Sequence, residues 1–243
     1  MAGNVPSCDS RIIYNNLKQL NLCRIYSQTY IKHILAIILS GFTAGFKGKT
    51  VNFEQSSSCH RTTVAYFLNH GKWDDSRLGD VLKQSAISII YHESAITGSP
   101  VFCIVDDTIS SHKKPSSKAL HPIEDAYFHQ SHLKRKQDYG HQAVAVMLSC
   151  NGLTLNYAII IYNKSKSKID IVREIAEELP VPPVISYFLC DSWYTTVKLS
   201  DAFIKKGFYT IGALKTNHVI FPCGIKQGIS GFAPYIRKEE PVL

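Results

Sequence analysis

The sequence lacks the motifs that mark several common classes of protein. It contains no Cys-x-x-Cys or Cys-x-x-His pair, which argues against a zinc finger or a thioredoxin-type redox site. No Walker A loop, Gly-x-Gly-x-x-Gly turn or Gly-x-Ser-x-Gly elbow occurs, so nucleotide binding and serine-hydrolase chemistry have no motif behind them. The seven cysteines are odd in number and scattered along the chain, which indicates free thiols in a reducing cytosol.

Long apolar stretches and acidic charge are also scarce. The longest apolar stretch, residues 34–46, is too short to span a bilayer. No apolar stretch follows a basic start at the N-terminus, so we expect no signal peptide, no membrane partner and a soluble, cytoplasmic protein. Asp and Glu number 19 against 27 Lys and Arg, a formal net charge of +8 that favours polyanions or an anionic surface as partners.

Length and composition are those of a folded protein with two different halves. The 243 residues suffice for one large domain or two small ones, and 45% hydrophobic residues argue against disorder. Apolar residues follow helical periodicity over residues 10–93, whereas the pattern from Pro100 onward is that of strands. We therefore expect a helical region over residues 1–95 and an α/β domain over residues 100–243.

A helix-turn-helix is a candidate within the helical region. A short helix over residues 52–55, a serine turn and a helix over residues 60–69 would form it. The front of the second helix is polar and suited to phosphates and base edges. That front consists of His60, Arg61, Thr62 and Thr63. The apolar back consists of Val64, Phe67 and Leu68. An ordinary helical bundle is the open alternative.

The second half predicts a mixed sheet of five strands with flanking helices. The expected strands are residues 101–108, 143–149, 153–162, 184–190 and 208–214. Asn151-Gly152 is the strongest hairpin signal in the chain. Helices are expected over residues 170–179, capped by Ser167 or Asp170, and over residues 194–206. Hairpins give antiparallel pairs and helical crossovers give parallel ones, so this order is that of a ribonuclease-H-like fold.

Two carboxylates follow apolar strands of this predicted sheet. Asp107 closes the first strand and Asp191 follows the fourth. A buried charge is costly unless it is paired or bound to metal, and neighbouring strands would bring both carboxylates to one edge. Their hard oxygens suit Mg²⁺ or Mn²⁺. Two such ions can activate an attacking oxygen and stabilise a leaving oxygen in phosphodiester chemistry.

Asp106 competes with Asp107 for this metal-binding role. Side chains alternate along a strand, so only one of the two can face Asp191. A strand-end turn made by Asp107 with Thr108 is the alternative interpretation of that carboxylate.

Several segments resemble bacterial insertion-sequence transposases of the DDE type. Residues 105–108 (Val-Asp-Asp-Thr) and 189–192 (Leu-Cys-Asp-Ser) are similar to the first and second acidic motifs of that family. Residues 126–129, 139–142, 61–69 and 72–74 also resemble family segments, and the likeness extends from about residue 35 to residue 214.

The resemblance implies a protein that cuts and joins double-stranded DNA at transposon ends, using Mg²⁺ or its substitute Mn²⁺. In the family the aspartate directly before threonine binds the metal, which favours Asp107 over Asp106 as the partner of Asp191. The resemblance also favours DNA reading by the helix pair, and a homodimer on DNA is a further expectation.

The sequence departs from the family pattern near its C-terminus. Family members supply a third carboxylate, a glutamate, from a helix well beyond the fifth strand. Prolines and glycines interrupt the chain after Leu214, so no helix of useful length is expected there, and Glu239 and Glu240 are the only late acids. We therefore expect the last catalytic helix to be missing from a truncated copy. The alternative function is a catalytically inactive DNA-binding remnant or an inhibitor of an intact transposase.

Basic residues are concentrated between the first two predicted strands. They are Lys113, Lys114, Lys118, Lys134, Arg135 and Lys136. Beside a metal site they would hold the DNA backbone, and a solvated loop is the equal alternative. Lys164, Lys166 and Lys168 are expected to form a second, exposed basic strip. Trp193 is expected to be a packing residue, although it follows Asp191 closely enough for contact with a flipped base to be the alternative.

Overall fold

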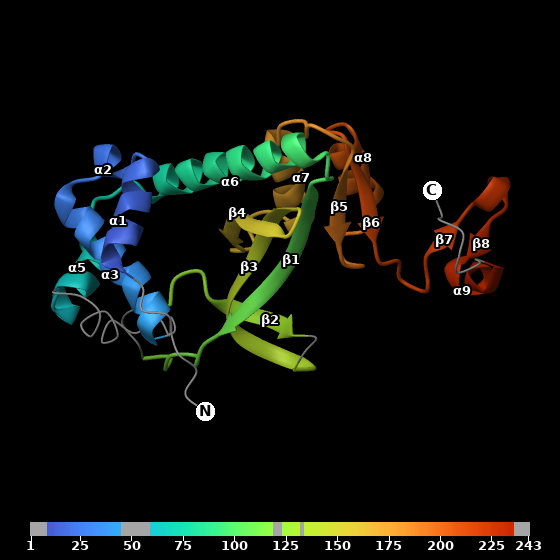
Figure 1. Cartoon of the computed structure of the whole chain (residues 1–243). Coiled ribbons are helices and arrows are strands. Elements are labelled where there is room, and N and C mark those ends of the chain that lie inside the picture. Colours follow the sequence, from blue (N-terminus) through green and yellow to red (C-terminus); the bar gives the residue numbers. More distant parts are fainter. Residues whose placement is uncertain (1–8, 45–58, 119–122, 132–133, 236–243) are drawn as a thin grey trace, which may run out of the picture. The chain divides into compact units, whose positions relative to one another are not determined.

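The computed structural model describes residues 9–44, 59–118, 123–131 and 134–235 (Figure 1). The chain divides into two compact units, residues 1–81 and 82–243, each with its own hydrophobic core. The assignment of residues 1–95 to DNA binding and of residues 100–243 to catalysis stays a prediction.

The first unit is helical. It contains α1 (Ser10–Gln19), α2 (Leu22–Ile25), α3 (Gln28–Ala44), α5 (Arg61–His70) and the start of α6 (Asp75–Thr97). Its core includes Ile13 and Leu17 of α1 and Ile31 and Ile34 of α3, which are spaced as the residues on one face of a helix are. Leu68 is 46% exposed instead of packed, because the apolar back of α5 is formed by Val64 and Phe67. The expected helix over residues 52–55 lies outside the described residues.

The second unit is built on a mixed sheet, as predicted. Its strands are β1 (Phe102–Ser111), β2 (Tyr127–Ser131), β3 (Lys136–Cys150), β4 (Leu153–Ile161), β5 (Ser186–Cys190) and β6 (Phe208–Gly212). The order is β2-β3-β1-β5-β6, and β4 also pairs with β3. β1 and β4 run antiparallel to β3, whereas β5 pairs in parallel with both β1 and β6. β2 is a sixth strand that the sequence did not predict.

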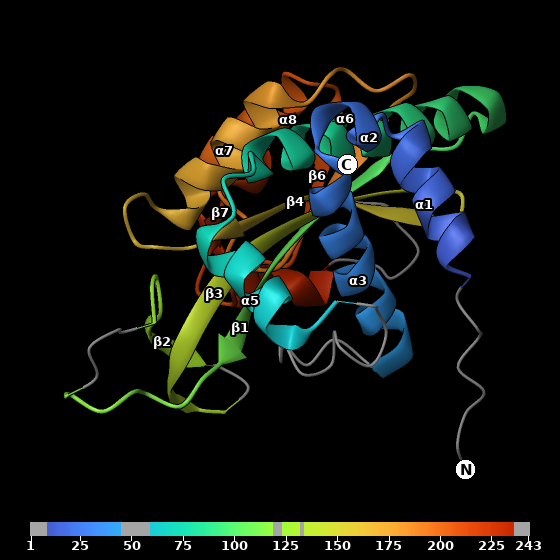
Figure 2. The same cartoon turned by 90° about the vertical axis from the view of Figure 1, so that its left-hand side faces the viewer.

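Helices α6, α7 (Lys168–Glu178) and α8 (Val197–Ile204) supply apolar side chains to the core on one face of this sheet (Figures 1 and 2). Cys103 and Val105 of β1 and Phe188 of β5 point to this face and are buried. Ser167 caps α7, its hydroxyl accepting the amide hydrogen bond of Asp170, which decides between the two predicted caps.

A small hairpin follows β6. It consists of β7 (Val219–Ile220) and β8 (Gln227–Gly228) and leads into α9 (Ile229–Phe232), the only α-helix in the described part after β6. Across the described ranges, no helix combines the length and apolar character that crossing a membrane requires.

Candidate metal and DNA site

Asp107 and Asp191 come to the same edge of the sheet because β1 and β5 are parallel neighbours. Val105 lies opposite Cys190 in this pairing, and Asp191 follows directly after Cys190. Asp107 lies two residues beyond Val105 but does not close its strand as expected, because pairing with β3 continues β1 to Ser111. Asp107 lies on the same side of β1 as the buried Val105, whereas Asp106 lies on the opposite side and is exposed. Asp107 and Asp191 line a cavity of about 780 Å³, and Asp106 is not among the lining residues.

Tyr194 contacts both carboxylates. Its hydroxyl donates a hydrogen bond to Oδ2 of Asp107 at 3.2 Å, and its backbone N–H donates to Oδ1 of Asp191 at 3.2 Å. The side chain is 1% exposed, and burial, with the charge of Asp107, raises the pKa of Tyr194 far above its usual value. The hydroxyl therefore keeps its proton and remains a donor. Sequence reasoning did not single out this residue.

The turn from β5 into α8 is fixed by Asp191 itself. Its Oδ1 also accepts the backbone N–H of Trp193 at 2.9 Å, which forms an Asx turn. Because residues 191–194 form this turn, the helix does not begin at residue 194 as expected. Thr196 caps α8 instead, so the helix begins at Val197. The same carboxylate thus shapes the loop and faces the cavity.

Lys168 forms an ion pair with Oδ2 of Asp107. The lysine and aspartate side chains are 15% and 24% exposed, so Lys168 does not belong to an exposed basic strip, and that expectation was wrong for this residue. β4 runs parallel to β1, so the helix that follows it starts at the edge where Asp107 lies.

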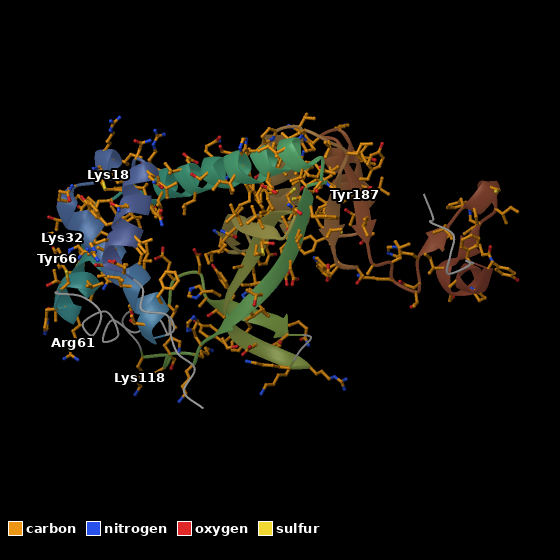
Figure 3. All side chains as sticks on the ribbon, viewed as in Figure 1. Lys18, Lys32, Arg61, Tyr66, Lys118 and Tyr187 are labelled. Atoms are coloured by element: carbon orange, nitrogen blue, oxygen red, sulfur yellow. The ribbon has the colours of Figure 1, made fainter. Side chains whose placement is uncertain are left out.

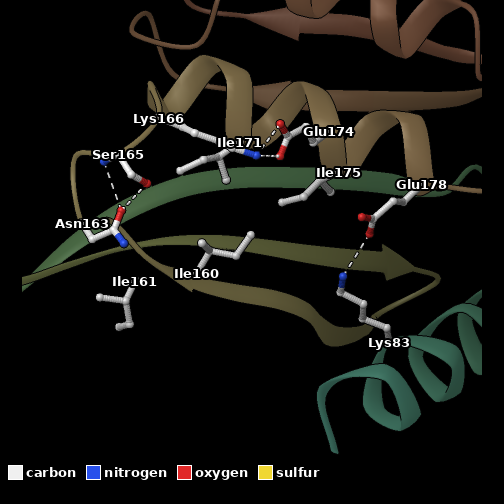
Figure 4. A pocket seen from close by; sticks show the side chains of 10 residues that line it. All are labelled: Lys83, Ile160, Ile161, Asn163, Ser165, Lys166, Ile171, Glu174, Ile175 and Glu178. Carbon is white, nitrogen blue, oxygen red and sulfur yellow. Dashed lines mark hydrogen bonds and ion pairs between the residues drawn. The ribbon is translucent and has the colours of Figure 1, made fainter. Parts of the chain in front are cut away.

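Lys166, two residues earlier, points elsewhere. It pairs with Glu174 at 2.7 Å in a separate hollow of the same unit, where Lys83 also pairs with Glu178 (Figure 4). The two neighbouring lysines therefore have different carboxylate partners in different places.

Further basic and aromatic side chains line the cavity that holds the two aspartates. Lys134 donates to Oδ2 of Asp138 at 2.7 Å, and this bond holds the pKa of Asp138 below its usual range. Lys168 and Lys215 each place Nζ 5.2 Å from the ring centroid of Trp193. Trp193 is 48% exposed and is not the packing residue we expected. Among the predicted DNA-contacting residues, Lys134 alone lines this cavity.

The other predicted DNA-contacting residues lie on exposed segments. Lys113 and Lys114 follow β1, while Arg135 and Lys136 lie at the turn from β2 into β3. Residues 61–63 form the exposed first turn of α5 in the first unit, where Arg61 is labelled in Figure 3.

The donor set fits a magnesium or manganese ion. Mg²⁺ is usually held by one or two carboxylates and keeps waters or substrate phosphates as its remaining ligands. Here Asp107 and Asp191 line an open cavity, together with Asp138, which is paired with Lys134. Within the described ranges no three His, Cys, Asp or Glu side chains gather into a metal cluster. Glu239 and Glu240 lie outside those ranges.

The mixed sheet, its flanking helices and the two carboxylates at one edge define a protein of the ribonuclease-H-like class. Residues 97–221 match the family model described as Transposase DDE domain, and the chain belongs to this family. The family implies DNA binding, and its members generally use divalent metals. Searches of curated proteins and of solved structures gave no match.

Proposed function

We propose that this protein is a DNA transposase that cleaves and joins strands at transposon ends in the cytoplasm. The observation that carries the proposal is the cavity shared by Asp107, which lies within β1, and Asp191, which follows the parallel neighbouring strand β5, within a chain of the DDE family. Both carboxylates would hold Mg²⁺ or Mn²⁺, which supplies activation of the attacking oxygen and neutralisation of charge on the phosphate.

Other residues at this site orient Asp107 and bind the DNA backbone. Tyr194 and Lys168 orient Asp107 through its Oδ2 atom. Lys134 and Lys215, in the same cavity, are placed to hold the backbone phosphates of the bound strand.

A wider surface would contact the DNA beyond the cleaved bond. Lys113, Lys114, Arg135 and Lys136 extend the basic surface along the duplex, and Arg61, Thr62 and Thr63 of residues 1–95 contact the transposon end. Both sets are sequence-predicted contacts that remain proposals. A homodimer would hold the two ends together.

The test is a nicking assay with Mn²⁺ on a supercoiled plasmid that carries the gene with its flanking DNA. Asp107→Asn should lower nicking by more than about 100-fold. Replacing a residue that only hydrogen-bonds to a metal ligand costs up to about 100-fold, and the loss of a ligand itself should cost more. Asp106→Asn is the matched control, because it removes the adjacent carboxylate on the opposite side of the strand and should leave nicking within a few-fold of the wild type. Equal losses in both variants would refute the assignment.

A non-catalytic DNA-binding protein, acting as a remnant or as an inhibitor of an intact transposase, is the second candidate. It is favoured by one observation: within the part of the chain that the structure describes, no third carboxylate joins Asp107 and Asp191 in a group that could hold a metal, and Asp138, which lines the same cavity, is paired with Lys134. In that case the wild type and Asp107→Asn would show the same negligible nicking, while both would still bind duplex DNA.

A further inference from the structure

Lys168 forms an ion pair with Asp107, the carboxylate proposed to bind the divalent ion. Its Nζ is paired with Oδ2, the atom that also accepts the hydroxyl of Tyr194. Both partners of the ion pair are more than three-quarters buried, so water does little to screen the two charges from each other. The ammonium is therefore a strong local counter-ion for this carboxylate.

A divalent cation and an ammonium cannot share one carboxylate at low cost, because two positive charges would lie a few ångströms apart in a poorly screened site. Two aromatic rings offer Lys168 an alternative position for its ammonium group. Its Nζ already lies 5.2 Å from the ring centroid of Trp193 and 5.7 Å from that of Tyr162, within the range of cation–π attraction. A modest rotation away from Asp107 would keep the ammonium over these rings.

We propose that Lys168 is a positioning residue that competes with the divalent ion for Asp107: it holds the carboxylate in place while no metal is bound and moves aside when the ion arrives. The inference rests on the proposed function, because it takes Asp107 as a metal ligand. It adds that the Lys168 ammonium weakens metal binding by Asp107 and keeps this carboxylate ordered while no metal is bound.

The experiment measures Mn²⁺ affinity by calorimetry on the full-length chain. Lys168→Met, which keeps the length of the side chain and removes its charge, should bind Mn²⁺ about tenfold more tightly than the wild type, a typical coupling between groups in contact. Lys168→Arg keeps the charge and should bind Mn²⁺ no more tightly than the wild type. Lys166→Met is the matched control, since this lysine pairs with Glu174 outside the cavity, and its affinity should be unchanged.

Thermal unfolding gives a second readout that does not depend on DNA cleavage. Without metal, Lys168→Met leaves Asp107 uncompensated and should unfold at a lower temperature than the wild type in EDTA. Added Mn²⁺ should then raise the unfolding temperature of Lys168→Met more than that of the wild type. A purely structural role for Lys168 would lower both temperatures equally and would overturn the proposal.

The result of Asp107→Asn separates this inference from the proposed function. If Asp107→Asn abolishes Mn²⁺ binding while Lys168→Met leaves the affinity unchanged or weaker, the metal site stands and the competing role of Lys168 falls. If neither the wild type nor Lys168→Met binds Mn²⁺, both proposals fall.

Discussion

Tyr194 is the side chain whose loss should disturb the two aspartates most directly. Tyr194→Phe removes the hydroxyl that donates to Asp107 and changes little else in a buried position. A hydrogen bond to a charged group contributes about 1.5–3 kcal/mol to stability, and the partly exposed Asp107 places the expected loss at about 1–2 kcal/mol. Nicking should fall as well, because Asp107 loses the hydroxyl that orients its carboxylate. Urea unfolding and the plasmid assay measure the two effects.

Tyr91→Phe is the control for this prediction. The Tyr91 hydroxyl donates to the backbone oxygen of Pro180 at 2.7 Å, outside the cavity. Its loss should cost a similar or smaller free energy of unfolding while nicking stays unchanged. Wild-type nicking by Tyr194→Phe would show that this hydroxyl has no part in orienting Asp107.

At the scale of single residues, the sequence predicts the carboxylates far better than their partners. Asp107 and Asp191 can be found because an acid that ends an apolar run is unusual and strand order brings these two positions together. The end of the apolar run at Asp107 is not the end of the strand, since β1 continues to Ser111. Lys168 and Tyr194 reach Asp107 across 61 and 87 residues of sequence, and no spacing rule predicts such contacts. Lys168 was therefore assigned to an exposed strip, although its helix begins at the same edge as Asp107.

Helix α7 gives the next prediction, at the scale of an element. The Ser167 hydroxyl accepts the N–H of Asp170 at 3.1 Å and so fixes the first turn, where Lys168 lies. Ser167→Ala should lower the free energy of unfolding by about 1 kcal/mol, as is typical for a lost N-cap. The first turn should fray, and hydrogen exchange should become faster at the amides of Asp170 and Ile171, which donate to Ser167.

Ser165→Ala is the matched control for the cap. Ser165 lies in the same loop, but its hydroxyl bonds to the side chain of Asn163 and caps no helix. It should leave both the unfolding free energy and the exchange rates of α7 close to wild type. An equal effect of the two substitutions would mean that the loop as a whole, not the cap, holds the start of α7.

The elements themselves were predictable where apolar periodicity is strong. All five expected strands form, and the Asn151-Gly152 turn joins β3 to β4 as the hairpin signal indicated. The sequence does not predict β2, because this strand has only five residues and lies within a basic segment whose pattern resembles a loop. Pairing with the long strand β3, a tertiary contact, makes this segment a strand.

At the scale of the whole molecule, the excess of positive charge is unevenly distributed. Acidic residues of α7 are matched by basic partners: Asp170 pairs with Lys198, Glu174 with Lys166 and Glu178 with Lys83. The carbonyl of Glu177 also accepts a bond from Lys206. The segment after β1 and the turn between β2 and β3 carry Lys and Arg in excess of acids. We therefore expect DNA to be attracted mainly by the segment after β1 and the turn between β2 and β3, where the positive charges are not matched by acids.

The salt dependence of duplex binding tests whether that distribution or the net charge alone matters. Replacing Lys113, Lys114, Arg135 and Lys136 by Gln should make the slope of log K against log salt shallower by up to about 3.6, because each of the four phosphate contacts contributes roughly 0.9. The control replaces Lys83, Lys166, Arg173 and Lys198, each of which is ion-paired with an acid of α7, by Gln. It lowers the net charge equally but should leave the slope nearly unchanged. Because phosphate contacts are local, equal changes in the two variants would mean that the duplex responds to total charge and that the region around β2 is not its binding surface.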